Sequence, residues 1–151
     1  MTDKIYVLNG PNLDLLGERE PEIYGSQTLA DVQRLCLDAA NKYGASVICR
    51  QTNAEHEMVA WLHEARRARG IVLNPAGFAY HAVPVLDALR ACECPIVEVH
   101  ISNLYQREEV WRRHSLLAAA ATGVITGLGI EGYRLAVEYL LRRSAPASRP
   151  G

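Results

Sequence analysis

Short apolar runs alternate with longer amphipathic segments along most of this chain. The apolar runs have the length of buried strands, and they fall at residues 5–8, 46–49, 71–73, 95–99 and 124–126. Apolar positions at helical spacing predict helices at residues 28–43, 58–68, 83–91 and 130–142, with a shorter helix at 107–113. Because strands that alternate with helices form βαβ units, we predict an α/β fold with a five-stranded parallel sheet and helices on both faces.

Local signals predict where several elements end. Thr28 followed by Asp31 resembles a capping box and favours a helix start, while Gly44 is a suitable stop. Gly70 is expected to end the helix at 58–68. Residues 1–143 are expected to form a single domain, and the Pro/Ser-rich tail at 144–151 is expected to be disordered.

Composition excludes several classes of partner. The chain has 151 residues, 49% of them hydrophobic, and a formal net charge of −1, which argues against a broad electrostatic grip on nucleic acid or on an anionic membrane. No apolar run approaches the roughly 18–20 residues that span a bilayer, and the N-terminal segment is not typical of a signal peptide. We therefore expect a cytoplasmic protein without nucleic-acid or membrane partners.

Neither the cysteines nor a glycine-rich motif indicates a cofactor. The four cysteines lack the C-x-x-C spacing of zinc and redox sites, and we interpret them as small buried hydrophobes: Cys36, Cys49, Cys92 and Cys94. Residues 127–132 match the G-x-G-x-x-G pattern of dinucleotide-binding turns, but the 19 residues that follow provide no second strand for a ribose-binding acid. We interpret this motif as a tight strand-to-helix turn whose glycines allow close packing.

Polar residues follow three of the predicted strands. Residues 9–12 (NGPN) come after the first strand, residues 74–81 (NPAGFAYH) after the third, and residues 100–103 (HISN) after the fourth. For any one of them ordinary turn chemistry is a sufficient explanation. Because the carboxyl ends of parallel strands meet at one edge of the sheet, the three together predict a ligand site there.

The segment at residues 17–25 is long for a connection between a strand and a helix, and glycines bound it. A mobile active-site lid has this character, although a surface loop with a packed tyrosine also fits. Arg19 and Tyr24 are its chemically interesting pair. A tyrosine hydroxyl is a poor base near neutral pH, but an adjacent guanidinium favours the phenolate, which is a useful one.

Glu98 and His100 lie at positions i and i+2 and therefore on one face of the fourth strand. A carboxylate that binds one imidazole nitrogen fixes the tautomer and suits the ring to general acid catalysis; a purely structural pairing is the alternative. Ser102 follows at the exit of the strand, where its hydroxyl could hold a carboxylate. The arginines at 107, 112 and 113 are either a solvated basic face or a site for an anionic or hydroxylated small molecule.

The sequence resembles the type II 3-dehydroquinate dehydratases over residues 5–141. The matching motifs are LNGPNL at 8–13, GEREPEIYG at 17–25, NP at 74–75, VEVHISN at 97–103, RRHS at 112–115, and the stretches 122–125 and 132–133. The resemblance implies a flavodoxin-like three-layer fold and a catalytic domain that forms a homododecamer, a tetramer of trimers. It implies a lyase that removes water from 3-dehydroquinate without metal or cofactor, in the shikimate pathway or in quinate catabolism.

The same resemblance implies roles for individual residues. Tyr24 would remove the proton from C2, assisted by Arg19, and Asn12 would help to hold a water that stabilises the enolate. His100, oriented by Glu98, would protonate the departing hydroxyl. The substrate-binding residues implied are Asn74, Ile101 and Ser102 at the carboxylate, Arg112 at the ring hydroxyls, and Asp87 from a neighbouring subunit.

This chain departs from the family pattern at three places. Tyr80 stands where the family has a histidine, and His81 comes one residue later. One extra residue, Val110 or Trp111, precedes the RRHS motif, and Leu116 replaces an aromatic residue after it. Either His81 or the Tyr80 hydroxyl replaces the missing imidazole, or the chain is a paralogue for a related cyclic hydroxy-keto acid or a weakly active homologue. We favour the first, because the segment at 17–25 and the Glu98–His100 pair are intact.

Overall fold

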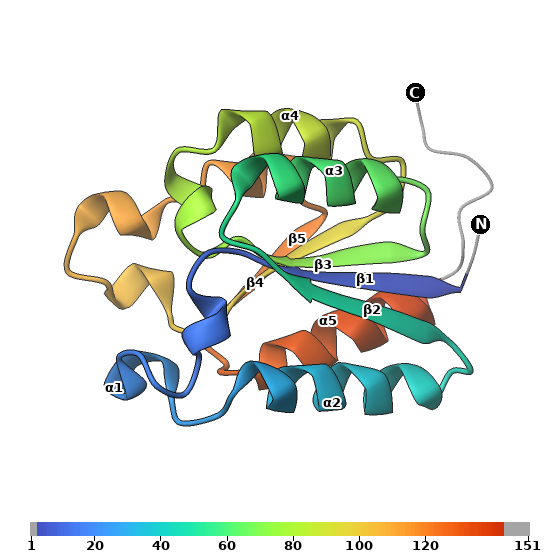
Figure 1. Ribbon diagram of the computed structural model, residues 1–151, viewed down its shortest axis with the longest axis horizontal. Coiled ribbons are helices and arrows are strands. Elements are labelled where there is room, and N and C mark those ends of the chain that lie inside the picture. The colour runs from blue at the N-terminus through green and yellow to red at the C-terminus, as the bar shows by residue number, and fades with distance from the viewer. Residues whose placement is uncertain (1–2, 144–151) are drawn as a thin grey trace.

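The computed structural model describes residues 3–143 and shows a five-stranded sheet in which every neighbouring pair of strands is parallel (Figure 1). The strand order is β2-β1-β3-β4-β5. In chain order the strands are β1 (Lys4–Asn9), β2 (Ser46–Gln51), β3 (Gly70–Asn74), β4 (Ile96–His100) and β5 (Gly123–Thr126). The predicted fold class is confirmed, and this strand order is the flavodoxin-like one. The predicted disordered tail lies outside the described residues.

Four long helices cover the sheet, two on each face (Figure 1). Helices α2 (Leu29–Asn41) and α5 (Glu131–Arg142) lie on one face, and α3 (Glu55–Ala65) and α4 (Val83–Arg90) on the other. A further short helix, α1 (Pro21–Tyr24), lies in the segment that precedes α2. Thr28 caps α2 through the predicted capping box with Asp31.

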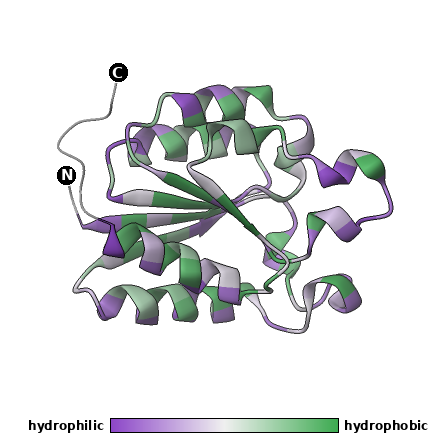
Figure 2. Cartoon of the chain, turned by 180° about the vertical axis from the view of Figure 1, so that it is seen from behind, coloured by the Kyte–Doolittle hydropathy of each residue, from purple (hydrophilic) through white to green (hydrophobic). Residues whose placement is uncertain are grey.

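Alternate residues of each central strand point into different halves of the core. In β1, Ile5 and Val7 pack with α2 and α5, whereas Tyr6 and Leu8 pack with α3 and α4. Figure 2 shows the result: the central strands are largely hydrophobic, while the helices carry polar residues as well. A strand that is buried on both faces reads as a continuous apolar run, which is why the strands were predictable from the sequence.

Two predicted boundaries and one predicted helix are wrong. Helix α3 begins at Glu55, three residues before the predicted start at Met58. The start was missed because the first turn is acidic and has no buried residue. Gly70 does not end α3 but opens β3, where a Cβ atom would lie 2.8 Å from the Leu140 side chain. The helix predicted at 107–113 is wrong in type and extent, because only Val110–Arg113 is helical there, as a 3₁₀ turn; a second 3₁₀ turn, Leu104–Gln106, precedes it. The glycine-rich turn after β5 is confirmed, with positive φ at Gly127 and Gly129.

Arg69 joins the two ends of the described chain at the amino-terminal edge of the sheet. Its guanidinium donates to the carbonyls of Leu140, Leu141 and Arg143, the closest at 2.8 Å. The same group pairs with the Asp3 carboxylate at 3.5 Å. Because this cation lies at the C-terminal end of α5, it also satisfies carbonyls that have no partner within the helix.

Candidate active site

The loops that follow β1, β3 and β4 surround a cavity of about 150 Å³ at the carboxyl edge of the sheet. Nine of the twelve residues predicted for the site line it: Asn12, Arg19, Tyr24, Asn74, Tyr80, His100, Ile101, Ser102 and Arg112. Strand order explains the convergence, because β1, β3 and β4 are neighbours in the sheet although helices separate them in the sequence. Glu98 lies next to this cavity, and His81 and Asp87 lie outside it.

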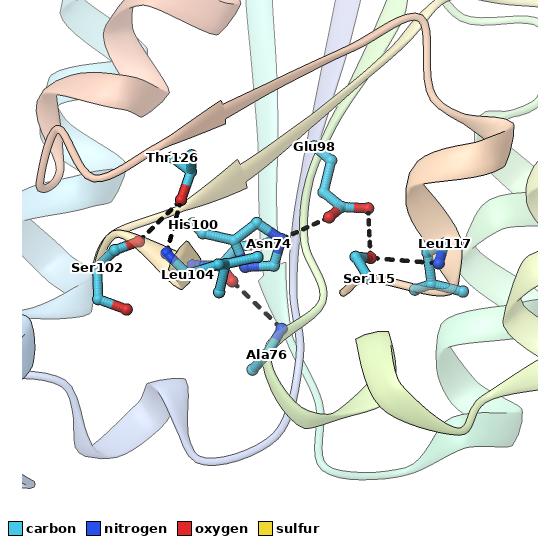
Figure 3. A network of polar contacts seen from close by, with 9 residues as sticks. All are labelled: Asn74, Ala76, Glu98, His100, Ser102, Leu104, Ser115, Leu117 and Thr126. Carbon is cyan, nitrogen blue, oxygen red and sulfur yellow. Dashed lines mark hydrogen bonds and ion pairs between the residues drawn. The ribbon is translucent and has the colours of Figure 1, made fainter. Parts of the chain in front are cut away.

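A buried carboxylate holds the cavity histidine (Figure 3). His100 Nε2 lies 2.5 Å from Glu98 Oε2, and the two side chains are 5% and 1% exposed. The second oxygen of Glu98 accepts a hydrogen bond of 3.1 Å from Ser115 Oγ, which itself accepts from the Leu117 N–H. The carboxylate is thus fixed from both sides, and it fixes the orientation of the imidazole.

Two guanidiniums flank Tyr24. Arg107 donates from Nη1 to the Tyr24 hydroxyl at 3.2 Å and lies 3.4 Å from Ser102 Oγ. The central carbons of Arg19 and Arg107 lie 5.6 and 5.7 Å from the centre of the Tyr24 ring. Both guanidiniums therefore lie within contact distance of the Tyr24 side chain. The sequence placed Arg107 only in a basic cluster, and its separation of 83 residues from Tyr24 concealed the contact.

The segment at residues 17–25 carries Arg19 and Tyr24 to the cavity. Gly17 and Gly25 at its two ends both have positive φ, and a Cβ on Gly17 would approach the Ser26 carbonyl oxygen to 2.9 Å. The segment therefore needs glycine at its first position. Its middle forms α1, which the sequence did not predict, and Tyr24 is the last residue of that helix.

A buried tyrosine joins the ends of β1 and β3. Tyr133 of α5 donates to Asn9 Oδ1 at 2.7 Å and accepts from Asn74 Nδ2 at 2.8 Å. Burial raises the pKa of Tyr133, so its hydroxyl stays neutral and keeps both bonds. Asn74 Oδ1 accepts from the Ala76 N–H at 3.2 Å, which leaves the Asn74 side chain oriented from two directions. The sequence placed Tyr133 only in a stretch that matches the family, and gave it no role in the site, because it lies within an apolar helical pattern.

Asn12 adopts a left-handed backbone conformation with φ of 69°. Asparagine tolerates this region better than most residues. The Asn12 N–H donates to Asn53 Oδ1 at 2.9 Å, and Gln51 Nε2 donates to the same oxygen at 3.0 Å. The loop after β2 therefore orients the loop after β1.

The three departures from the family pattern lie together. The Tyr80 and Trp111 rings pack edge to face with centroids 5.2 Å apart, and the Arg112 guanidinium lies over both of them. The Leu116 N–H donates to the Ala79 carbonyl at 2.7 Å. Desolvation raises the pKa of Tyr80 although the Arg112 charge opposes it, so Tyr80 presents a neutral hydroxyl.

His81 and Asp87 are exposed, and neither contributes to this cavity within one chain. The His81 ring contacts Phe78 edge to face, with centroids 6.4 Å apart. Of the two candidates to replace the missing imidazole, only Tyr80 lines the cavity.

Residues 3–143 contain no cluster of three or more His, Cys, Asp or Glu side chains arranged to hold a metal ion. Within the same residues, no helix is long and apolar enough to cross a membrane.

Comparison with known proteins gives a consistent family. The family model "Dehydroquinase class II" matches residues 3–141. A 3-dehydroquinate dehydratase of Streptomyces avermitilis is 57% identical over 136 residues, covering 89% of this chain and 85% of the relative, and one of Streptomyces coelicolor is 54% identical over 138 residues, covering 90% and 87%. The crystal structure of type II dehydroquinase from Propionibacterium acnes superposes with a TM-score of 0.89 at 42% identity, covering 95% of this chain and 99% of that one. This chain belongs to the class II dehydroquinase family.

Proposed function

We propose that this chain is a lyase that dehydrates 3-dehydroquinate to 3-dehydroshikimate. The relatives named above carry the name of this activity, which would serve the shikimate pathway or quinate catabolism. The observation that carries the proposal is the Tyr24 hydroxyl, which lies 3.2 Å from Arg107 on a cavity that His100 also lines. The site thus combines a phenol flanked by cations with an imidazole oriented by a buried carboxylate.

The first step is removal of a proton from C2 of the substrate, next to the ketone. The Tyr24 phenolate takes this proton, and the charges of Arg19 and Arg107 stabilise the phenolate before the transfer. The electron pair of the broken C–H bond moves toward the ketone oxygen and forms an enolate. Asn12 helps to hold a water that donates to this oxygen, a role that its place in the cavity wall permits.

The second step expels the hydroxyl group from C1. The enolate collapses to form the C1–C2 double bond, and His100 donates a proton to the leaving oxygen, which departs as water. Glu98 stabilises the protonated imidazole before this transfer and keeps its ring in place. Asn74, Ile101 and Ser102 bind the carboxylate end of the substrate, and Arg112 and Tyr80 bind the ring hydroxyls.

Turnover of 3-dehydroquinate, followed by the ultraviolet absorbance of the conjugated product, tests this function. We expect strong activity in the wild type and a loss of about 10²–10⁴-fold in Tyr24→Phe, because the general base is removed. Tyr105→Phe is the matched control, since Tyr105 is 71% exposed and does not line the cavity. Negligible wild-type activity that Tyr80→His restores would overturn the proposal and indicate a related cyclic hydroxy-keto acid as substrate.

We further propose that the chain assembles as a homododecamer, a tetramer of trimers, in which Asp87 reaches the cavity of a neighbouring copy. Two observations support self-association: Asp87 is exposed and outside its own cavity, and large apolar side chains are exposed on α4, β5 and the turn after β5. The exposed apolar side chains in these three places are Val83, Val124 and Leu128.

Native mass spectrometry and mixed refolding test this assembly. Twelve chains of 16.7 kDa give a particle of about 200 kDa. If Asp87 acts between copies, Asp87→Ala and Tyr24→Phe chains that are inactive alone regain activity when refolded together, because mixed oligomers contain sites with both native residues. A monomer, or full activity of Asp87→Ala alone, would refute the shared site.

A further inference from the structure

We propose that Trp111 is a positioning residue that holds the Arg112 guanidinium against the cavity, so that the guanidinium is already oriented when it meets a hydroxylated ring. The inference rests on the proposed function and deepens it. It assigns a role to a residue outside the cavity wall.

The geometry around Arg112 carries this inference. The central carbon of the guanidinium lies 4.5 Å from the centre of the Trp111 ring and 5.7 Å from the centre of the Tyr80 ring. The Arg112 Nε–H donates to Glu109 Oε2 at 2.7 Å, so the two terminal nitrogens remain for a ligand. One arginine is therefore held by a carboxylate and by two aromatic rings.

Burial separates the role of Trp111 from that of a core residue. Trp111 is 56% exposed, and the cavity lining includes Tyr80 and Arg112 but not Trp111. Its ring contacts both of these lining residues. It packs edge to face against Tyr80, with ring centroids 5.2 Å apart and an interplanar angle of 87°, and it lies under the Arg112 guanidinium. Trp111 therefore contacts two residues of the cavity wall without lining the cavity itself.

This support matters because a free arginine side chain loses much rotational freedom when it binds a ligand. A guanidinium that is already stacked loses less, so binding is stronger for the same hydrogen bonds. The proton-transfer residues Tyr24 and His100 have no contact with Trp111 among those described. We therefore expect Trp111 to govern substrate binding and to leave the chemical step unchanged.

The test compares KM and kcat for 3-dehydroquinate in Trp111→Leu and Trp111→Phe. Loss of one cation–π contact at an exposed site corresponds to roughly a two- to fivefold rise in KM, with kcat unchanged. Trp111→Phe, which keeps an aromatic face, is expected to restore most of the binding. Val110→Ala is the control, since Val110 precedes Trp111 and is 69% exposed.

A double-mutant cycle shows whether Trp111 acts through Arg112. Arg112→Ala alone is expected to raise KM more than Trp111→Leu does, and the two changes together are expected to raise it no further. An active wild type whose KM does not respond to Trp111→Leu, or additive effects in the double variant, would overturn the positioning role alone. A wild type that neither binds nor converts 3-dehydroquinate would overturn the proposed function, and this inference with it.

Discussion

At the scale of single residues, the site depends on polar groups that are buried and fully paired. Glu98 is 1% exposed, and each of its carboxylate oxygens has a partner, one in His100 and one in Ser115. A carboxylate in such surroundings cannot turn to water when a partner is lost. Ser115 therefore contributes to the orientation of His100 although it does not line the cavity.

Replacing Ser115 by alanine is expected to lower kcat about tenfold. The change removes the hydrogen bond to Glu98 Oε1 and leaves a buried oxygen unpaired, at a cost of about 1–3 kcal/mol. A carboxylate held less firmly also orients the His100 imidazole less firmly. Ser115→Thr keeps a hydroxyl and is expected to retain most of the activity. The measurement is kcat in all three proteins, with Ser46→Ala as a control at an exposed serine; equal kcat in Ser115→Ala and wild type would contradict the role.

A contact between two site residues could be predicted from the sequence where the two lie close in the chain. Glu98 and His100 were predictable as a pair, because positions i and i+2 of a strand share a face. Arg107 and Tyr133 acquire their partners only through folding, across 83 and 59 residues to Tyr24 and Asn74. No local periodicity carries that information, so these contacts needed the structure.

At the scale of elements, the strands and long helices were predicted best, since burial fixes their patterns. The start of α3 was missed because its first turn, from Glu55, is polar and gives no apolar signal. The segment at 107–113 was predicted to be one helix, but it contains only the 3₁₀ turn Val110–Arg113, and the Arg113 Nε–H donates to the Arg107 carbonyl across it. Just before it, the Leu104 N–H donates to Thr126 Oγ1, which donates to the Ser102 carbonyl (Figure 3). The Thr28–Asp31 capping box, in contrast, was predictable because it is entirely local.

That capping box makes the stability of α2 depend on pH. The hydrogen bond from the Thr28 backbone N–H holds the pKa of Asp31 below its ordinary value. A carboxyl group with a lowered pKa in the folded state stabilises the protein above its unfolded value of about 3.9, and this contribution is lost as the pH falls through the folded value. Asp31→Ala is therefore expected to lower Tm at pH 7.

The same comparison at acid pH is decisive. The difference in Tm between wild type and Asp31→Ala is expected to shrink toward zero as the pH falls below about 3.9. Asp38→Ala, at an exposed position in the same helix, is expected to show no such pH dependence. A constant difference for Asp31→Ala across the pH range would contradict the role of the Asp31 carboxylate in the cap.

At the scale of the whole molecule, one hydroxyl ties together three elements that the chain order separates. Tyr133 of α5 binds Asn9 at the end of β1 and Asn74 at the end of β3, and Asn74 also lines the cavity. These strand ends are neighbours only because the sheet has the order β2-β1-β3-β4-β5. The network therefore links the stability of the fold to the geometry of the site.

Tyr133→Phe is expected to reduce the free energy of unfolding by roughly 2–4 kcal/mol, because Asn9 Oδ1 and Asn74 Nδ2 lose this buried partner. Urea denaturation of the variant measures the loss. Tyr139→Phe is the matched control in the same helix, since Tyr139 is 48% exposed, and it is expected to change stability by less than about 0.5 kcal/mol. Equal losses in the two variants would show that the buried network contributes no stability.

The Arg69 contacts have a practical consequence for fusing this protein to a partner or immobilising it. Arg69 gathers Asp3 and the end of α5 at the edge of the sheet opposite the cavity. A fusion partner, an affinity handle or a solid support joined at either end of the described chain would therefore leave the cavity mouth of that chain uncovered. For the same reason, a short linker could join residues 3 and 143 in a circularly permuted chain whose new termini are opened in an exposed loop. We expect the cavity of such a chain to stay intact.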